Sequence, residues 1–215
     1  MPKKELALKN ATALGAYLLI VWGLYRFLFK LPDEIEELFV KPVIWLVPVF
    51  YLLKKEKSKL STLGLTSKNF FPAIYFALGL GAFFVIEAIF INFVKYQGFS
   101  FSANLGNTTF LASLGLSFAT AAVEEITFRG YIFNRVWHAL GGEWAANLLT
   151  SLAWGLVHVP ITFFVWKLDF GASLIYLFLT IIFGIGSAFV FARTRNIFSS
   201  ILLHVLWAWP IILFR

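Results

Sequence analysis

The sequence predicts an all-α fold, a polytopic transmembrane helical bundle of about seven spans, within a range of six to eight. Hydrophobic residues make up 60% of the 215 residues and charged residues only 13%, a balance outside the range of soluble globular domains. Apolar runs long enough to cross a bilayer recur along the whole chain. The 26 Phe and 8 Trp residues suit lipid-facing surfaces and interfacial belts. We expect a single membrane domain, residues 1–215, with helices of unassigned role in residues 1–107 and the candidate site in residues 108–215.

The apolar runs set the expected spans in order along the chain. The first run, residues 11–29, has no small-residue cleavage pattern at its end, so we expect a retained helix. The second run, residues 38–53, is the weakest, because Lys41, Pro42 and Pro48 interrupt it. A basic run at residues 54–59 follows it and reads equally well as a solvated loop or as an interfacial segment. The other five expected spans are residues 71–94, 108 to about 128, 144–166, 170–192 and 197–214.

The basic residues fall between the apolar runs, so the net charge of +7 predicts an orientation in the bilayer and no nucleic-acid partner. Twelve of the 18 Lys and Arg residues lie on the side of the expected bundle that holds the N-terminus, and six lie on the other. Arg129 and Arg135 count among the twelve, in a connection after the fourth span, and Lys41 counts among the six. By the positive-inside rule, the N-terminus and that connection face the cytoplasm. We expect an integral protein of the plasma membrane with its site facing the cytoplasm.

Two adjacent carboxylates, Glu124 and Glu125, stand out near the end of the fourth span, after an uncharged stretch at residues 110–123. Ionisable groups at membrane depth need partners, a water-filled cavity or a function. Arg129 follows Glu125 by four residues, so on a helix the two lie on one face and pair. Glu124 points about 100° away from Glu125 and is left to face another group.

Two histidines lie inside later spans, His158 just before Pro160 and His204 seven residues into the last span. We expect both to meet Glu124 in the cytoplasmic half of the bundle. A carboxylate beside a neutral imidazole can hold and deprotonate a water molecule, and a second imidazole can donate to the oxyanion that forms on a carbonyl. For either histidine alone, an interhelical hydrogen bond is the simpler reading. Together with the acidic motif they outline a hydrolase without a covalent nucleophile.

Three motifs of the sequence resemble those of the CAAX protease and bacteriocin-processing enzymes, glutamic-type intramembrane endopeptidases related to the type II CAAX prenyl protease of eukaryotes. The first is Glu124-Glu125-x-x-x-Arg129, and the second is Trp154-Gly155-Leu156-Val157-His158, where the family usually has Phe in place of Trp. The third is the closing segment, residues 183–204, which ends at His204. The resemblance covers residues 110 to 209, about half of the chain. One position departs from it, because Ala208 stands where the family commonly carries Asn.

The resemblance implies a function and a role for each residue. Glu124 would be the general base that activates water together with His158, Glu125 would be held by Arg129, and His204 would stabilise the oxyanion. The expected substrate is a membrane-associated protein or peptide in the lipid bilayer. The cleaved bond would lie near its membrane-associated segment, and a C-terminal segment is one option. Ala208 removes a second oxyanion donor. No cofactor is implied.

Three other readings stay open. Two histidines and one carboxylate also suit zinc, so a zinc-dependent membrane protease with the same residues is an alternative, although the absence of cysteine excludes Cys-based metal sites. A proton-coupled membrane protein could use Glu87, a carboxylate in the third span that matches none of the motifs, together with Glu124, Glu125 and the histidines. The third is a non-enzymatic protein that keeps a decayed site.

Overall fold

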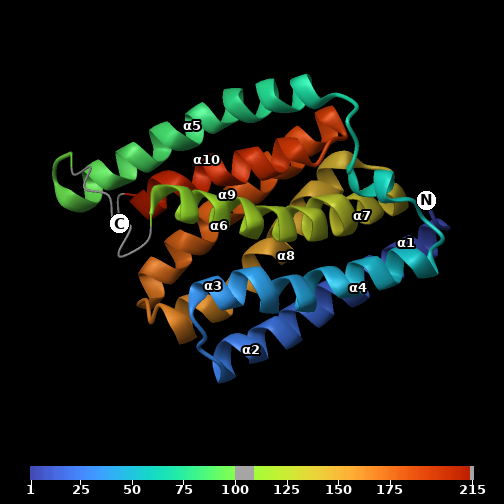
Figure 1. Ribbon diagram of the computed structural model, residues 1–215, viewed down its shortest axis with the longest axis horizontal. Helices are drawn as coiled ribbons and strands as arrows, with labels where there is room; N and C mark the ends of the chain where they lie inside the picture. Colours follow the sequence, from blue (N-terminus) through green and yellow to red (C-terminus); the bar gives the residue numbers. More distant parts are fainter. Residues whose placement is uncertain (100–108, 214–215) are drawn as a thin grey trace.

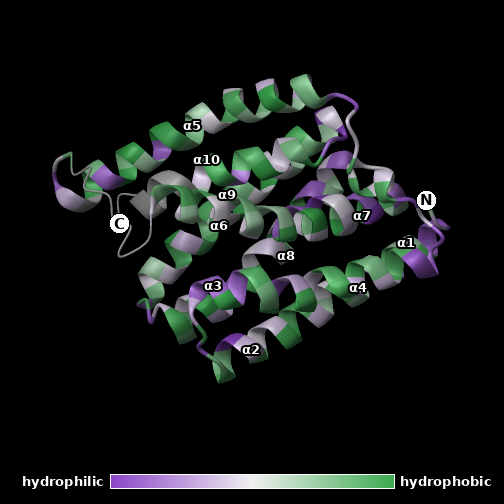
Figure 2. Ribbon diagram, in the orientation of Figure 1, coloured by the Kyte–Doolittle hydropathy of each residue, from purple (hydrophilic) through white to green (hydrophobic). Residues whose placement is uncertain are grey.

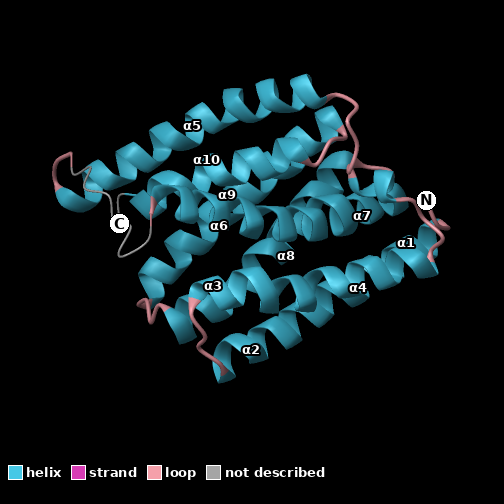
Figure 3. Ribbon diagram, in the orientation of Figure 1, coloured by secondary structure: helices cyan, strands magenta, loops and turns pink. Residues whose placement is uncertain are grey.

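The computed structural model of the chain describes residues 1–99 and 109–213, and every regular element in these ranges is a helix (Figure 3). The expected all-α helical bundle is therefore confirmed. Residues 1–99 form three long helical segments and a short 3-10 turn, and residues 109–213 form four. The first three segments are α1 (Lys4–Tyr17) with η1 (Leu18–Trp22) and α2 (Gly23–Leu28); α3 (Asp33–Ile35) with η2 (Glu36–Val40) and α4 (Lys41–Lys55); and, after η3 (Leu60–Leu63), α5 (Phe70–Tyr96). The last four are α6 (Phe110–Glu125) with η4 (Ile126–Phe133) and α7 (Asn134–Leu140); α8 (Glu143–Pro160) with η5 (Ile161–Val165); α9 (Phe170–Thr194); and α10 (Phe198–Leu213).

Each of the seven expected runs corresponds to one of these helical segments, and five of the segments have the length and hydropathy of a membrane span. Residues 33–55 are not among the five, and the apolar part of α10, Phe198–Ala208, is shorter. The expected limits at residues 108 and 214 lie outside the described residues. The chain is an integral membrane protein, and five of its described helical segments are long and apolar enough to cross the bilayer, where six to eight spans were expected.

The arrangement places apolar side chains outward and charges inward, as a lipid solvent requires. Figure 1 shows α5 lying along α10 at one side of the bundle, and these two helices share the most extensive packing in the described chain. The outer side of α5 carries exposed large side chains at helical spacing: Phe71, Tyr75, Phe83, Ile86 and Phe90. Hydrophilic residues gather at α3 and at the end of the bundle that holds the N-terminus (Figure 2).

The fourth helix differs from the expectation, because it continues to Leu140 instead of ending near Gly130. The connection expected directly after Glu124–Arg129 is therefore wrong. Arg129 and Arg135 lie inside the bundle, with exposed fractions of 2% and 0%, because each has a buried carboxylate partner. Gly130 allows this segment to pack tightly, since a Cβ there would lie 2.7 Å from the carbonyl oxygen of Leu63.

Glu56 pairs with Arg135 across the bundle. Glu56 belongs to the basic run at residues 54–59, so at this residue the run is not a solvated loop. The Arg135 guanidinium donates to Glu56 from Nε at 3.2 Å and from Nη2 at 3.1 Å, and both side chains are fully buried. Asn10 of α1 and the Tyr131 hydroxyl of η4 also donate to this carboxylate. One buried carboxylate thus joins the first, second and fourth helical segments.

A second set of bonds fixes the turn between α9 and α10. Asn196 donates to the carbonyl oxygens of Thr66 at 2.9 Å and Lys68 at 2.8 Å, and Asn69 donates to the carbonyl oxygen of Thr194 at 2.9 Å. The turn that starts α10 is therefore held by the segment between η3 and α5. This contact sets the position of the histidine two turns further along α10.

Candidate active site

Glu124 and Glu125 occupy the end of α6, near the middle of the 31-residue helix Phe110–Leu140 rather than near its end as expected. Their exposed fractions are 5% and 0%. The π-helical segment η4 begins at the next residue, Ile126, and such segments are frequent at functional sites. Both carboxylates face the interior of the bundle, so each must be paired there.

Glu125 is saturated by donors from three helices. Arg129 Nη1 donates to its Oε1 at 3.1 Å, which is the pair expected from the four-residue spacing. The Ser187 hydroxyl of α9 donates to Oε2 at 2.6 Å, and His204 Nδ1 of α10 lies 2.8 Å from Oε1. Arg129 also donates to the Gly184 carbonyl oxygen at 3.2 Å. Glu125 therefore holds the site together, with partners on both of its oxygens.

The contact with Glu125 fixes the His204 ring. An ionised carboxylate can only accept, so Nδ1 carries the proton of this bond. The other ring nitrogen, Nε2, then points toward Glu124, whose Oε2 lies 3.8 Å away. Aromatic rings of Phe183, Trp154 and Trp207 surround the imidazole, with centroid distances of 4.8, 5.9 and 6.0 Å. His204 thus has one nitrogen bound to the structural carboxylate and one directed at Glu124.

His158 is oriented by its own helix. Its Nδ1 lies 2.8 Å from the carbonyl oxygen of Trp154, one turn earlier in α8. A carbonyl oxygen only accepts, so Nδ1 is again the protonated nitrogen, and Nε2 of a neutral ring keeps its lone pair. His158 is half-buried and close enough to Glu124 for an electrostatic interaction. The structure therefore places His204 3.8 Å from Glu124 and His158 within the range of its charge, from two different helices.

Lys41, which sequence reasoning missed, is the group that Glu124 faces. Its Nζ lies 2.7 Å from Glu124 Oε1, and it also bonds Glu37, four residues earlier in the same helical segment. Glu37 in turn accepts from the Thr120 hydroxyl at 2.8 Å and lies 3.6 Å from Arg26. Lys41 is 3% exposed. The residue was expected among the charges on the membrane side opposite the N-terminus, but it lies in the interior of the bundle.

A signal for the pairing of Lys41 with Glu37 was present in the sequence. Glu37 and Lys41 have the same four-residue spacing as Glu125 and Arg129. This spacing indicates a helix in which the two charges pair. By composition alone, Lys41 instead interrupts the second apolar run, and the acidic residues before it read as a turn. The partner across the bundle, 83 positions away, has no local signal.

Two other positions from the sequence stand apart from this cluster. Glu87 lies half-buried in α5 and, among the described residues, forms no hydrogen bond or ion pair with the five expected site residues. Ala208 lies one turn after His204 and packs against the core. In the described ranges, no three His, Asp or Glu side chains are placed to hold a metal ion.

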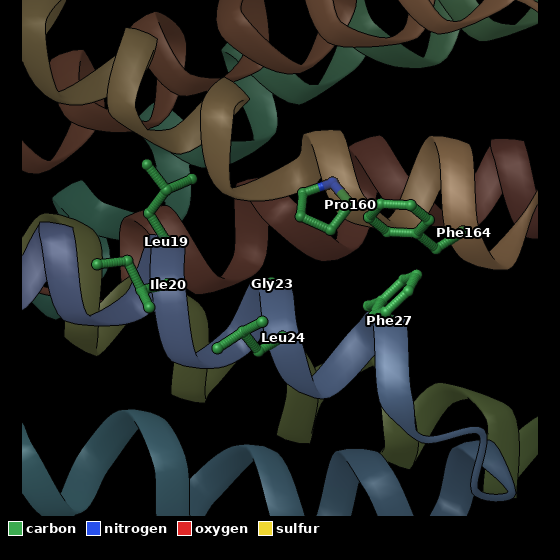
Figure 4. Close-up of a pocket in the computed structure, with 7 residues that line it drawn as sticks. All are labelled: Leu19, Ile20, Gly23, Leu24, Phe27, Pro160 and Phe164. Carbon is green, nitrogen blue, oxygen red and sulfur yellow. The ribbon is translucent and has the colours of Figure 1, made fainter.

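An apolar groove of about 460 Å³ on the surface of the bundle includes in its lining Pro160, two residues after His158 in the chain. It lies between the first helical segment and the α8–η5 helix (Figure 4). Its lining is Leu19, Ile20, Gly23, Leu24, Phe27, Pro160 and Phe164. Gly23 keeps the two helices close at this point, because a Cβ there would lie 3.3 Å from Pro160 Cγ.

The comparisons with known proteins agree with the resemblance of the motifs. A family model described as type II CAAX prenyl endopeptidase Rce1-like matches residues 106–210. The match includes all five expected site residues and leaves out Lys41, Glu37 and Arg26. A search of curated proteins found no match to the chain.

Proposed function

Residues 106–210 belong to the Rce1-like family of type II CAAX prenyl endopeptidases, and on that premise we propose that this membrane protease is of the glutamic type. Glu124 would activate the water, and His158 and His204 would assist it. The observation that carries the proposal is the convergence of Glu124 with two imidazoles whose Nδ1 atoms are both already committed to fixed acceptors. That leaves the Nε2 atom of each ring for chemistry.

The reaction follows from this arrangement. Water between Glu124 and His158 gives a proton to Glu124 as its oxygen attacks the peptide carbonyl carbon. The oxyanion that forms accepts from His204 Nε2, which donates when the ring carries both protons. Glu124 then passes its proton to the leaving amine as the C–N bond breaks. The site is regenerated with one water consumed.

The substrate is membrane-associated, because a membrane protease of this family acts within the bilayer. We propose that the cleaved bond lies near the segment that anchors the substrate, and a C-terminal segment is the first class to test. The apolar groove that includes Pro160 supports this, since it offers an apolar surface on the helix that carries His158.

A cleavage assay on purified protein in detergent tests the proposal and separates it from the zinc alternative. With a fluorogenic peptide that carries an apolar anchor, we expect cleavage to keep its full rate after incubation with a strong zinc chelator. The glutamic mechanism needs no metal. If the chelator abolished activity and added Zn²⁺ restored it, the proposal would be contradicted. Glu124 and the histidines would then be assigned as metal ligands.

We further propose that the N-terminus and the entrance to the site face the cytoplasm. Arg129 and Arg135 on one side, and Arg26 and Lys41 on the other, are buried in ion pairs and no longer count as loop charges. The original 12 to 6 division thus becomes 10 to 4, which favours the same orientation. His204 supports it, because six residues separate it from the start of α10, about 9 Å along the helix, at the end of the bundle that holds the N-terminus (Figure 1).

Cysteine labelling tests the orientation. The chain has no natural cysteine, and Lys59 and Lys30 are exposed at opposite ends of the second and first helical segments. In intact cells we expect Lys30→Cys to react with a membrane-impermeant thiol reagent and Lys59→Cys to react only after permeabilisation. The reverse pattern would place the N-terminus outside.

A further inference from the structure

The contact between Lys41 and Glu124 joins residues 106–210, the family-matched segment, to a residue outside it. Lys41 lies at the start of α4, and Glu124 at the end of α6. Their Nζ and Oε1 atoms are 2.7 Å apart. The residue proposed as the general base is therefore bonded by a helix of the N-terminal half.

The ammonium of Lys41 is held in one position. It bonds Glu37 as well as Glu124, and its side chain is 4% exposed. Glu37 is fixed on its far side by Thr120 and Arg26. A cation that bridges two carboxylates in a buried site has few alternative positions, so it constrains both of them.

This bond determines which oxygen of Glu124 is available. Lys41 occupies Oε1, and Oε2 is the oxygen near His204 Nε2, at 3.8 Å. A water bound to Oε2 would be placed between the carboxylate and the histidines. Turning the carboxylate would move the accepting lone pairs away from them.

We propose that Lys41 is a positioning residue that keeps Glu124 ionised and directs its Oε2 toward the histidines, an assignment that rests on the proposed function of Glu124. Lys41 bonds Glu124 directly, so it acts through the base. The N-terminal half of the chain thereby supplies part of the catalytic apparatus.

A purely structural ion pair would behave differently, and the chain provides one for comparison. Arg135 and Glu56 form a pair that is also fully buried and makes no bond to the site residues. Loss of that pair should lower the amount of folded protein and the midpoint of thermal unfolding. It should leave the pH profile of the folded molecules unchanged.

The experiment compares Lys41→Met, Lys41→Arg and Arg135→Lys in the full-length protein, with kcat and KM measured on one peptide from acid to neutral pH. For Lys41→Met we expect kcat to fall about 10²-fold, the loss typical of a misplaced reacting group, with little change in KM. The acid limb of kcat should move to higher pH, because a carboxylate that loses a neighbouring cation takes up a proton more readily. His158, His204, Arg129 and Arg26 also act on Glu124 and remain unchanged in this variant.

Lys41→Arg keeps the charge, so it should restore the position of the acid limb and part of kcat. Arg135→Lys should keep the wild-type profile. If Lys41→Met does not accumulate, Lys41→Gln takes its place, since it keeps a hydrogen-bond donor without the charge. A wild-type kcat and pH profile in the uncharged variant would overturn the assignment of Lys41.

A Glu124→Gln variant in the same assay separates this inference from the proposed function. If Glu124→Gln is inactive and Lys41→Met is normal, only the role of Lys41 is wrong. If Glu124→Gln is fully active, the glutamic mechanism itself fails. In the double variant Lys41→Met/Glu124→Gln, we expect no further loss beyond Glu124→Gln, because Lys41 acts through Glu124.

Discussion

Glu124→Gln is expected to abolish peptide cleavage, with kcat at least about 10³-fold lower, within the range of a lost general base. The amide cannot take the proton of the attacking water. Its oxygen can still accept from Lys41, which also keeps its bond to Glu37. The variant should therefore insert and purify like the wild type, so that the loss reflects chemistry rather than folding.

The matched control is Glu143→Gln. Glu143 is a carboxylate at the start of α8 that pairs with Arg193 at the surface, at the opposite end of that helix from His158. We expect its kcat to equal that of the wild type. Both variants are measured by single-turnover cleavage with enzyme in excess, which separates chemistry from product release. Wild-type activity in Glu124→Gln would rule out the glutamic mechanism.

The second large effect is a difference between the two histidines. His158→Asn should have no measurable activity, because Asn has no basic nitrogen in place of Nε2 to hold the attacking water while its proton passes to Glu124. His204→Gln should keep activity that is reduced about 10²- to 10³-fold, the usual cost of one oxyanion donor, since its amide can still donate one hydrogen bond. The order of these two effects distinguishes a base from a donor.

Both variants are compared on the same peptide with His138→Gln as a control. His138 bonds the carbonyl oxygen of Pro2 at the N-terminal end of the bundle and has no part in the proposed chemistry. We also expect Ala208→Asn to be neutral or to raise the rate, because it restores a donor one turn after His204. Equal and complete loss at both histidines, together with inhibition by chelator, would instead favour bound zinc.

The sequence predicts the helices and the ion pair between Glu125 and Arg129 well, because these depend on short-range patterns. Seven apolar runs correspond to seven helical segments, and the four-residue spacing of Glu125 and Arg129 is an ion pair in the structure. Helix periodicity and membrane length are local properties of the chain. The large error made from these patterns is the end of the fourth helix. Arg129 and Arg135 were expected in a loop there, but buried partners hold both in the bundle.

The contacts between distant segments could not be predicted from the same patterns. Lys41 reaches Glu124 over 83 positions, and Arg135 reaches Glu56 over 79. Lys41, Arg135 and Glu56 each look like a loop or interfacial charge when the partner is unknown. The cost of burying a charge without a partner indicates that partners must exist, but the identity of each partner is set by how the helices pack.

The buried carboxylate Glu56 makes the two halves of the chain interdependent. Arg135 lies within the family-matched segment, but the side chain that neutralises it comes from the end of α4. A hybrid protein that joined residues 106–210 to the N-terminal helices of a relative would leave this guanidinium without a counter-ion unless the relative carried an acid at the equivalent site. Transplanting the catalytic motifs therefore requires the N-terminal helices to be transplanted with them, as a single inherited unit.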